Sequence, residues 1–219
     1  MTEYANSEPT KMALIMAAGK LFAEHGIDAV TTRAIARKAQ ESLGVIHYHF
    51  GNKDGLLVAV MDYASEYWRD DPLGSFLNRN RLLLQTPDGQ EKLIVQMIKI
   101  YLSIIFSPNR PTWSRTLIFQ LIQRDLPISQ KIFDRVAYPC IQAFMEIYHA
   151  VAVDRDEEKA YHWSIAIFSS AVVSAVNPLA FQRMNPSRRP SDQFMDKLEN
   201  SCIDYAVASL RQLRADHGR

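Results

Sequence analysis

Net charge is almost absent from this sequence, because 25 lysines and arginines nearly balance 24 aspartates and glutamates over 219 residues. The overall charge of +1 therefore does not indicate a nucleic-acid partner, and any basic surface has to be local. Glycines are also few, at eight, and no segment sustains the alternation of apolar and polar residues that marks a strand. A β-sheet protein is not expected.

Cysteine is scarcer still, with only Cys140 and Cys202. They are far apart and in no CxxC spacing, which is typical of a reducing cytoplasm, and both fall in apolar segments where an inert, buried thiol is expected. The polar start, MTEYANSEPT, offers no signal peptide. Residues 161–181 lack Asp, Glu, Lys and Arg, but seven polar or helix-breaking residues there favour a helix buried in protein over a membrane span. We expect a cytoplasmic protein that does not enter a membrane.

Helical periodicity, in contrast, runs through nearly the whole chain. Helices are expected over about residues 9–26, 32–39, 43–50, 52–68, 87–107, 112–125, 127–152, 155–184 and 191–214. Pro139 is expected to kink or break the helix that contains it. The predicted fold class is therefore all-α, with about nine helices. A three-helix unit forms a first domain of residues 1–55, and a larger helical domain of residues 56–219 follows.

Two histidines, His47 and His49, lie two residues apart in the segment SLGVIHYHFGNKDGLL, a spacing that can chelate a metal ion. On a helix over residues 43–50, however, their side chains diverge by about 200° and cannot reach one ion, because an HxH chelate needs a strand. Ile46 and Phe50 share the inward face of this helix instead. No metal site and no cofactor are expected.

Two short helices joined by four residues, the second with small and aromatic residues facing outward, describe a helix-turn-helix. The outward residues are Gly44, Val45 and Tyr48. The local charge agrees, since residues 31–53 contain four cations and one carboxylate: Arg33, Arg37, Lys38 and Lys53 against Glu41. The charge of residues 31–53 alone is equally consistent with the solvent-exposed face of an ordinary helical hairpin that does not bind DNA.

The run TTRAIA at residues 31–36, followed by GVIHYHFGNKDGL at 44–56, resembles the DNA-binding domain of TetR-type transcriptional regulators. The resemblance covers about residues 10–57. The segment from QRDLP at 123–127 through Tyr138-Pro139 is also similar to the ligand-binding half of the CecR-like subgroup. The resemblance implies a ligand-responsive regulator, most simply a repressor that a small molecule releases from a palindromic DNA operator, and not an enzyme.

The resemblance also implies a role for each matching residue. Tyr48 is expected to contact base edges in the major groove, and Arg33 to reach a guanine. Gly44 and Val45 have little bulk and let the helix approach closely. The positions expected to contact phosphate are Thr31, Thr32, His47, His49 and Lys53. Lys53 is the clearest of these, because it stands on the first turn of a helix whose free amides also favour an anion.

Two departures from the family pattern affect these expectations. The turn reads Ala39-Gln40-Glu41 where most relatives have Ala-Gly-Val, and a left-handed residue without glycine costs roughly 1 kcal/mol, so a change in the shape of the turn is expected. Leu43 is then expected to supply the apolar plug that valine gives elsewhere, within the DNA-binding surface. His47 stands where tyrosine is usual, and a histidine can change its charge near neutral pH.

The last two helices predict a homodimer. The helix over 155–184 is apolar around its whole circumference, and the final helix has two apolar sides, so a second partner is expected, most simply a copy of the chain in a four-helix bundle. A helix buried deep within a monomer is the alternative. The residues expected at the dimer interface are Trp163, Ile167, Ala171, Val172, Ala175, Phe194, Leu198, Cys202 and Tyr205.

By resemblance, the middle helices enclose a pocket for an unknown small-molecule effector. The pocket candidates are the large or polar side chains on otherwise apolar helices: Trp113, Phe119, Gln120, Gln123 and His162. Each fits a plain core or surface position as well. The rival functions are an all-α enzyme, against which stands the lack of HExxH, GxSxG, P-loop and Cys–His motifs, and a helical adaptor that binds protein.

Overall fold

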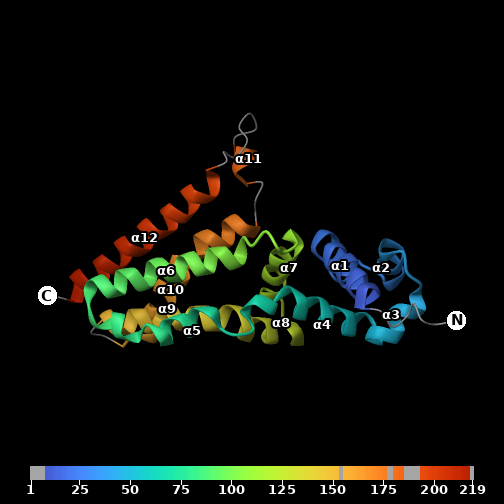
Figure 1. Cartoon of the computed structure of the whole chain (residues 1–219), viewed down its shortest axis with the longest axis horizontal. Helices are drawn as coiled ribbons and strands as arrows, with labels where there is room; N and C mark the ends of the chain where they lie inside the picture. Colours follow the sequence, from blue (N-terminus) through green and yellow to red (C-terminus); the bar gives the residue numbers. More distant parts are fainter. Residues whose placement is uncertain (1–7, 153–154, 177–179, 185–192, 218–219) are drawn as a thin grey trace. The chain divides into compact units, whose positions relative to one another are not determined.

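The computed structural model describes residues 8–152, 155–176, 180–184 and 193–217, and the regular elements in these ranges are all helices (Figure 1). The all-α class predicted from the sequence is confirmed. None of the helices in these ranges is long and apolar enough to cross a membrane. The backbone packs into two compact units, residues 1–67 with 109–133 and residues 68–108 with 134–219. The division into domains of residues 1–55 and 56–219 stays a prediction.

The first unit contains α1 (Glu8–His25), α2 (Thr32–Ala39), α3 (Leu43–Phe50), α4 (Lys53–Ala64), α7 (Thr112–Ile122) and α8 (Pro127–Ile132). Helix α1 packs against α2, α4 and α7, and α3 packs against α2 and α4. Their shared core is apolar and fully buried, and includes Leu14, Ala18, Phe22, Ile35, Ile46 and Leu56. Burying each of the larger side chains contributes roughly 1.5–3 kcal/mol, so helices as short as α2 and α3 are stable only as part of this core.

Caps and glycines set the ends of these short helices. Thr31 caps α2 by accepting a backbone amide hydrogen bond at 3.2 Å, and Asn52 caps α4 in the same way at 2.8 Å. Gly26 follows α1 and Gly51 follows α3, with φ angles of 81° and 74° that favour glycine. Helices α2 and α3 therefore have the bounds that the sequence predicts.

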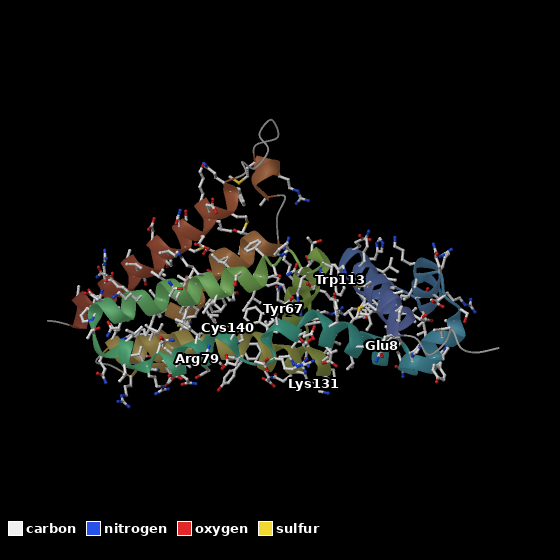
Figure 2. The ribbon with its side chains drawn as sticks, viewed as in Figure 1. Glu8, Tyr67, Arg79, Trp113, Lys131 and Cys140 are labelled. Atoms are coloured by element: carbon white, nitrogen blue, oxygen red, sulfur yellow. The ribbon has the colours of Figure 1, made fainter. Side chains whose placement is uncertain are left out.

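Helix α7 is held against α1 and α4. A side-chain carbon at Gly19 of α1 would lie only 2.4 Å from the Trp113 ring of α7, so glycine is what permits this approach. The Trp113 ring, marked in Figure 2, stacks on Tyr63 with centroids 6.1 Å apart. Arg110, just before α7, donates hydrogen bonds to the carbonyls of Tyr63 (2.8 Å) and Ala64 at the end of α4. These contacts make α7 part of the first unit.

The second unit contains α5 (Pro72–Arg79), the 3-10 helix η3 (Arg81–Gln85), α6 (Pro87–Ile105), α9 (Tyr138–Val151), α10 (Glu157–Val176), α11 (Ala180–Met184) and α12 (Phe194–His217). Helix α9 packs against α5 and α10, and α12 packs against α6 and α10. Glu91 of α6 accepts hydrogen bonds from Arg211 and Arg214 of α12, and this pairing, led by Arg211, lowers the pKa of Glu91 to about 2. The unit is therefore a bundle in which charged pairs add to apolar packing.

Three helix boundaries differ from the sequence expectation. The helix expected over 127–152 is interrupted by a π-helical turn, η4 (Phe133–Ala137), directly before Tyr138 and Pro139. Residues 72–85, where no helix was expected, form α5 and η3, and Asp71 caps α5 by accepting the Gly74 amide at 3.0 Å. The helix expected over 155–184 ends at Val176, and α11 follows from Ala180.

Candidate nucleic-acid interface

The turn between α2 and α3 contains a left-handed residue although it lacks glycine. Gln40 has φ 59° and ψ 35°, and its amide donates to the Arg37 carbonyl at 3.3 Å. The Glu41 amide donates to the Ala36 carbonyl at 2.9 Å, which closes the end of α2 as a glycine cap would. Gln40 therefore adopts the strained backbone itself, at a cost of about 1 kcal/mol, and the turn does not change shape to avoid it.

Helix α3 buries Ile46 completely and turns Tyr48 outward, where 64% of this residue is exposed. Gly44 is also exposed, and a carbon added there would meet only the Ser42 hydroxyl, at 3.8 Å. Leu43 and Val45 are half-buried. Tyr48 is therefore the large side chain that this face presents, and the small residue near the start of the helix leaves room for close approach by another surface.

The ring of His47 is held in a fixed orientation. Its Nδ1 lies 2.8 Å from the Gly51 carbonyl oxygen, and because a carbonyl only accepts, Nδ1 carries the hydrogen. In the neutral ring Nε2 is then a bare acceptor, which cannot bond a phosphate oxygen. When the ring is protonated, Nε2 becomes a donor. The charge of His47 therefore decides whether this exposed side chain can hold a phosphate.

His49 is less available than His47. It is half-buried, and its Nε2 atom is buried with no hydrogen-bond partner. Its ring makes an edge contact with Tyr48, with centroids 5.1 Å apart, and lies 5.9 Å from that of Phe50. Only Nδ1 is left to reach a phosphate, so the structure favours His49 as a packing residue that supports Tyr48.

Lys53 stands on the first turn of α4, as the sequence predicts, but its ammonium group already has partners. Nζ donates to the carbonyls of Ile27 (2.7 Å) and Val30 (2.8 Å) in the α1–α2 turn. These two bonds use two of its three hydrogens and tie α4 to that turn. Any phosphate contact by Lys53 is limited to the remaining hydrogen, so its role is at least partly structural.

The cations of α2 have no such partners. Arg33, Arg37 and Lys38 are exposed, and none of them has an ion pair or side-chain hydrogen bond with the described residues. In contrast, Lys20 of α1 lies 3.9 Å from Glu24. Arg33 and Arg37 are four residues apart, so they lie side by side, and such a like-charged pair destabilises a helix by about 0.2–0.5 kcal/mol. Arg37 and Lys38 were not among the predicted contact residues, although the charge imbalance in the sequence contained them.

The threonines at the start of α2 remain near this surface. Thr31 is exposed, and its Oγ1 accepts the capping bond but keeps its own hydrogen for a further acceptor. Thr32 follows as a half-buried residue of the first turn, where backbone amides are free. Together with Arg33 these residues form one end of α2 that can donate to an anion.

The five candidates for the effector pocket are divided between the two units. Trp113 packs against α1, and Gln120 of α7 reaches the Ala23 carbonyl of α1 at 3.4 Å. Gln123 is exposed and donates to the Phe119 carbonyl. These four candidates belong to the first unit, whereas His162 is exposed in the second. Their contacts join α7 to α1 or remain local, and periodicity alone could not reveal this.

The predicted dimer residues differ in how far the single chain buries them. Ile167, Ala171 and Cys202 are at most 3% exposed in the single chain, so they serve the core of their own protomer. Tyr205 of α12 is 52% exposed, and Val173 of α10, which was not predicted, is 56% exposed. The remaining members described are half-buried: Trp163, Val172, Phe194 and Leu198. The side chain of Ala175 lies outside the described residues.

An all-α chain whose first unit exposes the second helix of a helix-turn-helix belongs by architecture to the helix-turn-helix proteins. The model of a family described as bacterial regulatory proteins, tetR family, matches residues 14–60. The HTH-type transcriptional regulator TtgW of Pseudomonas putida is 32% identical over 117 residues, which cover 53% of this chain and 78% of that protein. The chain therefore belongs to the tetR family of bacterial regulatory proteins.

Other relatives match shorter parts. The regulator SrpR of Pseudomonas putida is 33% identical over 117 residues, or 53% of this chain and 49% of SrpR. The repressor Rv3405c of Mycobacterium tuberculosis is 41% identical over 56 residues, or 26% of this chain and 30% of that protein. The chain thus spans about half of SrpR and less than a third of Rv3405c.

Solved structures support the fold over nearly the full length. A regulatory protein of the tetR family from Rhodococcus has a TM-score of 0.61 at 19% identity, covering 95% of this chain and 98% of its own. The TetR-family regulator SCO4454 from Streptomyces coelicolor has a TM-score of 0.60 at 15% identity, covering 95% and 97%. At such identities the likeness concerns the fold alone.

Proposed function

We propose that this protein is a sequence-specific DNA-binding transcriptional regulator, a repressor that a small molecule releases from its operator. The observation that carries the proposal is the outward surface of the helix-turn-helix. Tyr48 is exposed on α3, and Arg33 and Arg37 are exposed on α2 without a counter-ion among the described residues. The phosphates of DNA can supply the counter-charge that these arginines lack. An exposed aromatic ring on a helix that otherwise presents small side chains can enter the major groove and contact base edges.

The helices divide the work of binding between them. Helix α3 enters the major groove, where Tyr48 contacts base edges and thymine methyl groups. The residues at the start of this helix, Leu43, Gly44 and Val45, allow α3 to approach the bases closely. Helix α2 crosses the backbone, with Thr31, Thr32 and Arg33 at its first turn. His47 adds a phosphate contact when its ring is protonated, and His49 and Lys53 mainly hold the surface in shape.

The regulator acts as a homodimer in this proposal. A single helix-turn-helix contacts too few bases for useful specificity, so two copies reading an inverted repeat are expected. The exposed residues Val173 of α10 and Tyr205 of α12 support an interface on these two helices. A bacterial regulator that binds DNA has to reach the chromosome, which agrees with the cytoplasmic location expected from the sequence.

Selection from a pool of random duplexes tests the proposal. The purified chain should enrich an inverted repeat with half-sites about one helical turn apart, and log affinity for it should fall linearly with log salt concentration, with a slope of several units. A pool that stays random after repeated rounds, or an affinity independent of salt, would contradict the proposal. Salt-independent binding to another protein would favour the adaptor alternative, and turnover of a small molecule the enzyme.

A further inference from the structure

The short turn between α1 and α2 is held from two other parts of the first unit. At the start of α4, Lys53 donates hydrogen bonds to the carbonyls of Ile27 and Val30. Directly after α7, Arg124 donates a hydrogen bond to the Asp28 carboxylate, with Nη2 2.6 Å from Oδ2. The α7 segment lies outside the helix-turn-helix, and yet it supplies the counter-ion of a residue in the turn that leads into α2.

Asp28 places a negative charge close to the end of α2 that we expect to contact phosphate. It precedes the N-cap Thr31 by three residues, so the two Cα atoms are at most about 11 Å apart. The Debye length at moderate salt is about 8–10 Å, so dissolved ions screen this charge only in part over such a distance. The Asp28 side chain is 80% exposed. Without a counter-ion, its carboxylate would repel a phosphate bound at Thr31 and Arg33.

The pair with Arg124 cancels this charge at short range. The hydrogen bond from Arg124 and the charge of its guanidinium, with a smaller effect of Lys53, lower the pKa of Asp28, so the carboxylate stays ionised and paired. Fold stability gives little reason for the pair, because its side chains are 37% and 80% exposed and exposed ion pairs contribute little to stability. Its effect is therefore expected on a charged ligand nearby.

We propose that Arg124 strengthens DNA binding without touching DNA, by neutralising the Asp28 carboxylate beside the phosphate-binding end of α2. The proposal rests on the proposed function, and it adds a residue from outside the helix-turn-helix to those that set the affinity. Arg124 acts through Asp28 on phosphates and not on bases, so it changes the affinity for all DNA sequences alike.

Neutral variants of the full chain test the proposal on a random-sequence duplex, with affinity measured by fluorescence anisotropy. At about 0.05 M salt, Arg124→Gln should bind about threefold more weakly than wild type, the effect of one unpaired charge about 10 Å from phosphates. Asp28→Asn should bind more tightly, because it leaves the Arg124 cation unpaired. The double variant should recover the wild-type affinity, and Arg124→Lys, which keeps the charge, should stay close to it.

Salt and stability separate this effect from a structural one. The loss in Arg124→Gln should nearly vanish by about 0.5 M salt, where the Debye length is about 4 Å, whereas a displaced α2 would bind weakly at every salt concentration. The melting temperature of this variant should match that of wild type. Arg81→Gln is the matched control, since it breaks the exposed ion pair of Arg81 with Glu146 in the second unit and should leave the affinity unchanged.

Three results would overturn the proposal. They are equal affinities of wild type and Arg124→Gln, a loss in Arg124→Gln that Asp28→Asn does not restore, and a loss that high salt does not diminish. The second result would assign Arg124 to direct contact with phosphate, and the third would assign it to holding α2 in place. Each of them leaves DNA binding by the wild type intact, whereas a wild type that binds no duplex would overturn the proposed function as well.

Discussion

At the scale of single residues, the proposed interface contains exposed side chains that are available to DNA and other side chains that support them. Tyr48 and Arg37 belong to the first kind. In contrast, Lys53 donates two hydrogen bonds to carbonyls of the first unit, and the half-buried ring of His49 packs against Tyr48. His47 lies between the two, with one ring nitrogen bound to Gly51 and the other free. Substitutions at these positions should therefore have different signatures.

Tyr48→Ala should reduce the preference for the selected operator over random DNA by about tenfold or more, because a base contact is worth ~1–3 kcal/mol of discrimination. Binding to random duplexes should change little, and so should stability, since Tyr48 is 64% exposed. Fluorescence anisotropy with both duplexes measures the ratio. An equal loss on both would assign Tyr48 to the backbone instead.

Arg37→Gln should weaken binding to operator and random DNA by the same factor and lower the salt slope by about one, because it removes one phosphate contact. Arg79→Gln is the matched control, since Arg79 is an exposed arginine at the end of α5 and is also marked in Figure 2. A salt slope that Arg37→Gln leaves unchanged would show that this cation is only a solvated surface residue.

Operator affinity should fall as the pH rises from about 6 to 8. A phosphate beside the free Nε2 of His47 stabilises the protonated ring, so DNA binding is coupled to the uptake of a proton. The affinity for DNA therefore decreases as the pH rises. A hydrogen bond to a charged group contributes roughly 1.5–3 kcal/mol, which corresponds to tenfold or more in affinity. Titrations at constant ionic strength should show this slope for wild type and a flatter one for His47→Tyr. Identical slopes would remove His47 from the interface.

At the scale of elements, the α2–α3 turn combines a regular shape with local strain. Gln40→Gly should stabilise the protein by about 0.5–1 kcal/mol, because glycine adopts φ 59° without the clash that a side chain suffers. Chemical denaturation measures the difference. Gln142→Gly, in the middle of α9, is the opposing control and should destabilise by a similar amount. A loss of stability in Gln40→Gly would mean that the glutamine side chain makes contacts worth more than the strain.

At the scale of the whole molecule, the homodimer depends on residues that the single chain leaves exposed. Tyr205→Arg should give monomers at micromolar concentration by light scattering, because it places a charge at the proposed interface. Leu82→Arg, at a residue 78% exposed in η3, should remain dimeric. An arginine at Ala171 is a poorer test, since Ala171 is buried in its own protomer and the variant would unfold it. A dimeric Tyr205→Arg, or a monomeric wild type, would contradict this interface.

The sequence predicted those features of the fold and candidate site that depend on residues close together along the chain. Capping by Thr31 and the stop at Gly51 can be read from the local sequence, so the bounds of α2 and α3 were predicted correctly. The same periodicity placed Ile46 inside and Tyr48 outside. The helix α5 was missed although its signals are local: Asp71 caps it, Pro72 stands in its first turn, and Leu73 and Leu77 recur at helical spacing.

The sequence alone determined the all-α class, the helix-turn-helix and its outward face, since each follows from local propensity and a short apolar period. Only the tertiary structure decided which partners those side chains meet. Lys53 reaches carbonyls more than twenty residues away, Trp113 packs over Gly19, and Cys202 and Ala171 turn toward their own core. A helical pattern shows that a face is apolar, but not which surface covers it, because that surface comes from residues distant in the chain.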